Sequence, residues 1–175
     1  MKWMIASDLH GNWECVERLL ARYRQEGAQM LLLLGDLLYP KGADTVAALL
    51  NPLKNEIICV RGNCDSLADQ RELEFPMLDE TRTLTFGTAS VFASHGDRYH
   101  SRRLPPMGVC DILLFGHTHV PECTKTHGVV CMNPGSVSRP RGGSTNSYMT
   151  WEKDVFLGNS LEGETLFQYV WTDKK

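Results

Sequence analysis

The stretch LLLLGD at residues 31–36 shows the pattern that decides the fold: a short apolar run stops at glycine, and a side chain able to bind metal follows at once. Four other stretches repeat this pattern, with glycine or serine at the stop. The five runs are Lys2–Ser7 before Asp8, Leu31–Gly35 before Asp36, Ile57–Gly62 before Asn63, Val91–Ser94 before His95, and Ile112–Gly116 before His117. Apolar runs of this length, rich in Ile, Leu and Val, are typical of buried strands. If the strands share one sheet and point the same way, their ends lie along one edge, where open α/β sheets bind ligands.

Length and composition predict a single globular domain over residues 1–175. The chain is 42% hydrophobic and 22% charged, and 175 residues are enough for a substantial core. A formal net charge of −3 gives no general attraction to nucleic acid or to anionic membranes. No apolar run approaches the roughly 20 residues that span a bilayer. The first run is also too short for a signal peptide, because Asp8 and His10 interrupt it.

The six cysteines are interpreted as reduced thiols. Cys59 and Cys131 lie in strand-like runs, Cys15 lies in an expected helix, and no pair has Cys-x-x-Cys spacing. Scattered cysteines without a framework are typical of intracellular proteins, which predicts a cytoplasmic location.

The order of expected elements changes near the middle of the chain. The first half alternates strand and helix, with helices expected at residues 12–26, 43–50 and 66–72. Asn12 is a suitable N-cap, and the i, i+3, i+4, i+7 spacing of apolar residues after it indicates a buried stripe. After Pro76 the expected elements are strands, at residues 81–86, 89–93, 120–125, 129–132, 147–151, 155–157 and 165–171. This order predicts an α/β fold with mixed sheets and helices outside them.

Two tripeptides, Asp8-Leu9-His10 and His117-Thr118-His119, each offer two metal donors. In extended backbone, residues two apart point to the same side, so each tripeptide can serve one cluster. The full set of candidate metal ligands is Asp8, His10, Asp36, Asn63, His95, His117 and His119. Seven donors are too many for one four-coordinate zinc site and suit two metals that share a carboxylate. Carboxylate, amide and imidazole together favour Mn²⁺, Fe²⁺, Zn²⁺ or Ni²⁺ over copper(I) or an iron–sulfur cluster.

At this point the chain resembles the calcineurin-like metallophosphoesterase superfamily. The resemblance rests on Gly35-Asp36, on Gly62-Asn63-Cys64-Asp65 and on the later histidine motifs, in order and spacing. The GNCD tetrapeptide and the later Asn133-Pro134-Gly135-Ser136 are similar to the small, single-domain bacterial and archaeal phosphodiesterase group within it. The similarity covers about residues 3–157. It implies a four-layer α-β-β-α sandwich of two mixed β-sheets flanked by helices, and it leaves a homo-oligomer open.

The resemblance also implies a ligand assignment and a reaction. One metal would be bound by Asp8, His10, Asp36 and His119, and the second by Asp36, Asn63, His95 and His117, with Asp36 as the bridge. The expected cofactor is two divalent ions per chain, with Mn²⁺ favoured and Zn²⁺, Fe²⁺ or Ni²⁺ as alternatives. Two such ions roughly 3.5–4 Å apart can hold a bridging hydroxide at neutral pH, which would attack a phosphodiester bond in a small phosphate ester. The metals would neutralise charge that develops in the transition state.

Four further assignments concern catalysis and substrate binding. Asn63 is expected to be both a ligand and a neighbour of the phosphate, and Asp65 is a further catalytic candidate. Many relatives carry histidine where this chain has Cys64; a thiol is a poorer proton donor near pH 7 and has no cationic form. We therefore expect weak protonation of the leaving group, which favours esters with good leaving groups, unless Cys64 merely fills space. Arg139 is a candidate for bidentate contact with substrate phosphate.

Two alternatives to a phosphodiesterase remain open. A phosphomonoesterase or nucleotidase would use the same metals. A non-catalytic scaffold would keep the fold, as the retromer small subunit does within this superfamily. Scaffolds of this kind tend to lose ligands, whereas Asp36, Asn63 and the three later histidines are all present.

Overall fold

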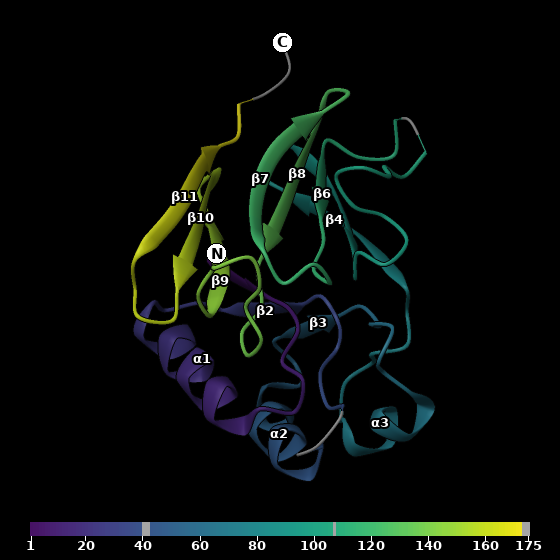
Figure 1. The fold of residues 1–175 in the computed structure, drawn as a ribbon, viewed down its shortest axis with the longest axis vertical. Coiled ribbons are helices and arrows are strands. Elements are labelled where there is room, and N and C mark those ends of the chain that lie inside the picture. Colours follow the sequence, from purple (N-terminus) through teal and green to yellow (C-terminus); the bar gives the residue numbers. More distant parts are fainter. Residues whose placement is uncertain (40–42, 107, 173–175) are drawn as a thin grey trace.

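The computed structural model describes residues 1–39, 43–106 and 108–172, and these form two β-sheets with helices on one side (Figure 1). The strands are β1 (Trp3–Ala6), β2 (Met30–Leu33), β3 (Ile57–Cys59), β4 (Thr81–Phe86), β5 (Ala89–Ser94), β6 (Ile112–Leu114), β7 (Pro121–Thr126), β8 (Val129–Pro134), β9 (Ser147–Glu152), β10 (Val155–Ser160) and β11 (Thr165–Val170). A six-stranded sheet has the order β11-β10-β9-β1-β2-β3, and a five-stranded sheet has the order β4-β5-β6-β8-β7. Both sheets are mixed, because each combines parallel and antiparallel pairs.

The helices begin and end close to the predicted positions. They are α1 (Trp13–Gln25), α2 (Ala43–Leu50) and α3 (Leu67–Glu72), and a short 3₁₀ helix, η1 (Asn51–Leu53), follows α2. The Asn12 side chain caps α1 by accepting a hydrogen bond from the backbone N–H of Cys15 at 3.1 Å. Ser66 and Asp69 form a capping box at the start of α3. No helix in the described ranges is long and apolar enough to cross a bilayer.

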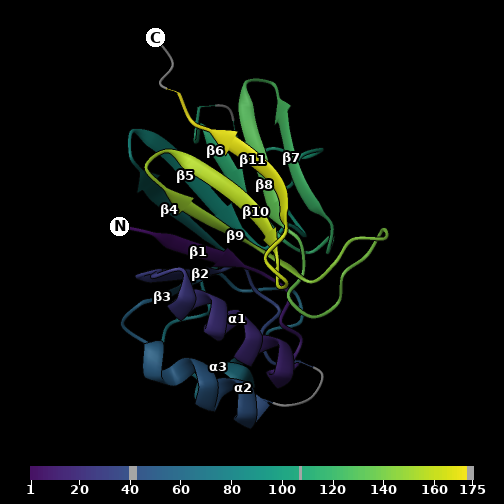
Figure 2. The same cartoon turned by 90° about the vertical axis from the view of Figure 1, so that its left-hand side faces the viewer.

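Successive side chains of the central strands point to opposite faces of the six-stranded sheet, so each face carries its own hydrophobic core. In β1, Met4 and Ala6 face the helices and pack with the buried stripe of α1, which includes Leu19. Trp3 and Ile5 face the other way and pack against the five-stranded sheet. Figure 2 shows the resulting layers, with α1, α2 and α3 below the six-stranded sheet and the five-stranded sheet on its far side.

The outer face of the five-stranded sheet is covered by an irregular segment. Phe92, Leu113 and Phe115 form a third cluster on this face, and Tyr99 and Leu104 of the connection between β5 and β6 pack against it. The described part of this connection contains no helix. The predicted sandwich of two mixed sheets flanked by helices is confirmed, with this segment as the outer layer on its second side.

The five apolar runs do not share one sheet, so the single ligand-binding edge considered from the sequence is wrong. β1, β2 and β3 are parallel neighbours in the six-stranded sheet, whereas β5 and β6 are parallel neighbours in the five-stranded one. The chain passes from the first sheet to the second at β4, which pairs with β5 as an antiparallel hairpin and not with β3. The carboxyl ends of two parallel groups therefore meet across the sandwich.

Candidate metal centre

Each sheet contributes part of one side-chain cluster. Asp8 and His10 follow β1, Asp36 follows β2 and Asn63 follows β3, whereas His95 follows β5 and His117 and His119 follow β6. Hydrogen bonds join the two groups: the backbone N–H of His117 donates to Asp8 Oδ2 at 3.0 Å, and His95 Nδ1 donates to the carbonyl of Leu34 at 2.7 Å. The site is thus built where the two sheets face each other.

The backbone at five of the seven candidate ligands is left-handed, not extended. The φ angles are 58° at Asp8, 46° at His10, 56° at Asp36, 64° at His117 and 61° at His119. The expectation that extended backbone points each pair of donors to one side is therefore wrong; tight left-handed turns do so instead. Non-glycine residues in this region cost about 1–3 kcal/mol each and cluster at functional sites.

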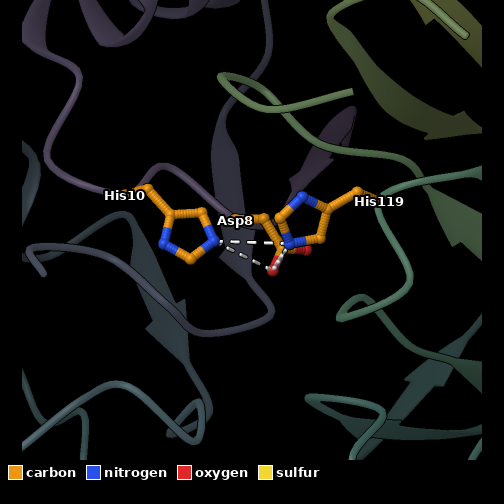
Figure 3. A group of neighbouring side chains, drawn as sticks. All are labelled: Asp8, His10 and His119. Carbon is orange, nitrogen blue, oxygen red and sulfur yellow. Dashed lines mark hydrogen bonds and ion pairs between the residues drawn. The ribbon is translucent and has the colours of Figure 1, made fainter. Parts of the chain in front are cut away.

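Asp8, His10 and His119 form the first group of donors, shown in Figure 3. The Nε2 atoms of His10 and His119 lie 3.3 Å apart, and Asp8 Oδ1 lies 3.8 Å from the first and 3.2 Å from the second. Asp8 Oδ1 is buried and has no hydrogen-bond partner among the residues that the structure describes. A buried carboxylate oxygen without a donor is costly. A cation held between these three side chains would remove that cost, so the residues fit a metal.

Backbone carbonyls fix the orientation of three of the imidazoles. His10 Nδ1 lies 3.3 Å from the carbonyl of Tyr39, and His119 Nδ1 lies 2.6 Å from the carbonyl of Arg139. His95 Nδ1 contacts Leu34 in the same way. A carbonyl only accepts hydrogen bonds, so Nδ1 carries the proton and Nε2 presents its lone pair to the cluster. This is the tautomer that a metal-binding histidine requires.

A second group surrounds Asp36. Its Oδ2 lies 3.5 Å from His95 Nε2 and 3.7 Å from His10 Nε2, so this carboxylate stands between the two sets of histidines. His95 Nε2 also lies 3.0 Å from Asn63 Oδ1 and 3.2 Å from His117 Nδ1. The seven side chains proposed from the sequence as metal ligands therefore lie in one connected cluster.

The cluster perturbs the pKa values of its members. Burial raises the pKa of Asp36, but the His95 ring beside it outweighs burial and leaves the pKa well below its usual range. Burial lowers the pKa of His95, and the Asp36 carboxylate reverses this and raises the pKa to about 9. Burial lowers the pKa of His10 and of His117. Without a metal, Asp36 and His95 thus form a buried ion pair beside two neutral imidazoles.

Cys64 lies at the edge of the cluster. Its backbone N–H donates to Asp36 Oδ1 at 2.8 Å, and its sulfur groups with donor atoms of His10 and Asp36. Burial, with the Asp36 carboxylate next in importance, raises the pKa of the thiol to about 11. The neutral thiol is therefore the form present near pH 7. This nearness to the metal donors is a feature that the sequence analysis missed, although the position next to Asn63 hinted at it.

Asp65 points away from the open side of the cluster. It is buried, with 4% of its surface exposed, and its carboxylate accepts three backbone hydrogen bonds. Oδ2 accepts from the N–H groups of Asp36 and Gly62, and Oδ1 accepts from that of Leu37, each at 2.8 Å. The structure thus places this catalytic candidate as a brace that joins the loop after β2 to the loop after β3.

Two glycines allow the loops to approach each other. A Cβ on Gly62 would lie 2.2 Å from Asp36 Oδ1, and one on Gly116 would lie 1.9 Å from Ser7 Oγ and 2.9 Å from Asp8 Oδ2. Any side chain at either position would displace a candidate ligand.

The segment that begins at Asn133, near the end of β8, contacts Asp8 through two serine hydroxyls. The hydroxyls of Ser136 and Ser138 donate to the carbonyl of Asp8 at 2.9 and 3.0 Å. Arg139 follows them with an exposed side chain, and its positive charge contributes to the lowered pKa of His10, which places it near the cluster. The sequence analysis singled out the motif from Asn133 to Ser136 but did not predict the contacts of Ser136 and Ser138 with Asp8.

Comparisons of the sequence and of the structure with known proteins find relatives of the same superfamily. The family model for the calcineurin-like phosphoesterase superfamily domain matches residues 1–154. The chain is 37% identical to the phosphodiesterase YfcE of Escherichia coli K12, over 97% of each chain. It matches a solved structure of the E. coli phosphoesterase YfcE with a TM-score of 0.91 and 36% identity, over 97% of this chain and 99% of that one. The zinc-bound Vps29 of Entamoeba histolytica shares the fold, with a TM-score of 0.67 and 22% identity over 97% of this chain and 99% of that one.

Proposed function

Because this chain belongs to the calcineurin-like phosphoesterase superfamily, we propose that it is a metal-dependent enzyme that hydrolyses phosphodiester bonds in small phosphate esters. The observation that carries the proposal is the buried Asp8 Oδ1, which finds no hydrogen-bond partner in the described part of the chain and faces the Nε2 atoms of His10 and His119. A cation between these converging acceptors would remove the cost of burying them without a donor.

The donor set suits two divalent ions, and Mn²⁺ is the ion we propose. Asp8, His10, Asp36 and His119 would hold one of them, and Asp36, Asn63, His95 and His117 would hold the other. The position of Asp36 between both sets of histidines supports its role as the shared ligand. When bound, the ions supply a nucleophile from water at neutral pH and neutralise charge on the phosphate. Bidentate oxygen ligands and imidazoles are compatible with Mn²⁺ and also with Zn²⁺, Fe²⁺ or Ni²⁺.

The chain's own residues would orient the substrate and influence the leaving group. Asn63 would contact the phosphate as well as a metal, because its amide lies at the border of the cluster. Arg139, exposed near His10, would bind a phosphate oxygen. The thiol of Cys64, with a pKa of about 11, is a weak acid, so we propose that esters with good leaving groups react fastest.

A substitution at Asp36 tests the catalytic proposal. Asp36→Asn removes the shared carboxylate charge, and we expect it to abolish Mn²⁺-dependent turnover of bis(p-nitrophenyl) phosphate and to weaken Mn²⁺ binding measured by calorimetry. Asp69, which is half-buried and caps α3 outside the cluster, provides the matched control in Asp69→Asn. Turnover that survives in Asp36→Asn would refute the dinuclear site, and absence of turnover in the metal-loaded wild type would favour the scaffold alternative.

Product analysis distinguishes the two enzymatic candidates. A phosphodiesterase releases one alcohol from a diester and leaves the monoester intact, whereas a phosphomonoesterase or nucleotidase releases inorganic phosphate from the monoester. We expect accumulation of p-nitrophenyl phosphate from bis(p-nitrophenyl) phosphate. Faster hydrolysis of the monoester would refute the diesterase assignment.

A further inference from the structure

Two pockets open next to the candidate metal centre. The first, of ≈ 180 Å³, includes Asn63 in its lining, and the second, of ≈ 370 Å³, includes His117. Asp97 lines both. Since Asn63 and His117 each contact His95 Nε2, both pockets adjoin the cluster. A phosphate bound at the cluster would direct its two ester arms toward them.

The walls of the first pocket are polar and held in place. Arg98 and Glu80 form an ion pair at 2.6 Å on one side. The Ser94 hydroxyl donates to the carbonyl of Tyr99 at 3.2 Å, which closes another side. Hydrogen bonding between the backbone N–H of Arg61 and the carbonyl of Asp79, at 2.8 Å, joins the remaining loops. The pocket is therefore formed before any ligand binds.

Two charged side chains in this lining are available to a ligand. Across the described ranges, neither the guanidinium of Arg61 nor the carboxylate of Asp97 makes a recorded hydrogen bond or ion pair, and both residues are exposed. Arg61 can only donate and Asp97 can only accept. A hydroxyl group both donates and accepts, so an arm with adjacent hydroxyls can satisfy both residues. An apolar or aryl arm would remove water from two charges without replacing its hydrogen bonds.

We propose that the first pocket binds a hydroxyl-bearing ester arm of the substrate, with Arg61 and Asp97 as specificity-determining residues. This inference rests on the proposed function, because it names the class of phosphodiester that the same site prefers. The volume of ≈ 180 Å³ suits a short polyol or a single sugar ring.

The experiment compares two esters with the same leaving group. These are p-nitrophenyl 2,3-dihydroxypropyl phosphate and p-nitrophenyl propyl phosphate, assayed with the Mn²⁺-loaded protein. The wild type is expected to show about tenfold higher kcat/KM for the diol, mostly through KM, as one hydrogen bond to a charged group would give. Arg61→Ala should raise KM for the diol more than for the propyl ester, so that the preference is lost. Arg71→Ala, which removes an exposed arginine of α3 outside both pockets, should keep the preference.

Calorimetry gives a readout that does not depend on turnover. We expect 2,3-dihydroxypropyl phosphate to bind the wild type about tenfold more tightly than propyl phosphate, and Arg61→Ala to lose the difference. Equal binding of the two monoesters, or a preference that survives in Arg61→Ala, would overturn the inference. Hydrolysis of both diesters without preference would refute the pocket assignment alone, whereas no hydrolysis of either would refute the proposed function and leave the binding comparison as the test of the pocket.

Discussion

Replacing Asp65 tests whether a residue that touches no substrate controls the metal centre. Its carboxylate joins the backbone of Asp36 and Leu37 to that of Gly62 through three hydrogen bonds of 2.8 Å. In Asp65→Asn the amide oxygen can replace Oδ2 and accept from Asp36 and Gly62, but the amide nitrogen then replaces Oδ1 and faces the backbone N–H of Leu37, which is left without an acceptor. The variant keeps the side-chain volume and removes the charge, so packing is conserved while the brace is weakened.

The magnitude follows from the number and kind of bonds. A hydrogen bond to a charged group contributes about 1.5–3 kcal/mol, and a buried donor left without an acceptor costs about 1–3 kcal/mol. Losing one bond and weakening two predicts about 2–4 kcal/mol of lost stability in Asp65→Asn, which a domain of 5–15 kcal/mol can tolerate. Groups that support metal ligands typically change metal affinity by about 10–100-fold, and we expect a loss of this size for Mn²⁺.

Urea unfolding of the apo protein and calorimetric titration with Mn²⁺ measure the two effects. Asp69→Asn is the matched control. This carboxylate also accepts hydrogen bonds from the backbone N–H and the hydroxyl of Ser66, at 2.7 and 2.6 Å, but it is only half-buried and lies outside the cluster. We expect the control to lose about 0.5–2 kcal/mol of stability, as for a helix cap, with unchanged Mn²⁺ affinity. Wild-type Mn²⁺ affinity in Asp65→Asn would show that the brace does not position Asp36.

Three other expectations concern backbone space, pH and the thiol. Gly116→Ala should weaken Mn²⁺ binding and lower the melting temperature, because its Cβ would crowd Asp8, whereas Gly128→Ala, in a left-handed turn with open space around it, should lower the melting temperature only. His95, with its pKa raised to about 9, favours the apo fold fully below pH 6.5 and loses this contribution as pH rises through 9. The proton competes with the metal, so Mn²⁺ affinity should increase from pH 6.5 to 9, and a pH-independent affinity would contradict the ion pair. Cys64→Ala should slow alkyl diesters more than p-nitrophenyl diesters in steady-state assays; an equally large loss for both would exclude a role of the thiol at the leaving group.

The sequence predicted the elements of the fold well because their signals are local. Asn12 and Ser66 cap their helices as such residues do, and alternation in β1 separates the two cores. Gly87 between two short strands predicts the β4–β5 hairpin, and the structure confirms it. The sequence did not show that β4 leaves β3 unpaired on that side and so divides the strands between two sheets, because the pairing of sheet edges depends on long-range packing.

The identity of the candidate ligands could likewise be predicted from the sequence, but their geometry could not. Aspartate and histidine after apolar runs indicated a metal centre, and the structure brings Asp8, Asp36 and the histidines together. Left-handed backbone at non-glycine residues has no reliable sequence signal, because tertiary contacts impose it. The orientation of the Asp65 side chain could not be predicted for the same reason, since two of its three hydrogen-bond partners lie 28 and 29 residues earlier in the chain.

Because the metal donors come from both sheets, metal binding has a consequence for how the protein unfolds. Asp8 and Asp36 belong to the end of one sheet, whereas His95 and His119 belong to the other, and Asp8 faces His119 while Asp36 faces His95. An ion shared by such a pair is a cross-link between the halves of the molecule. Separation of the halves would have to expel it, so the rate of global unfolding would fall as the concentration of free metal rises. Chelation would then shorten the lifetime of the native state even where each half keeps its own hydrogen bonds.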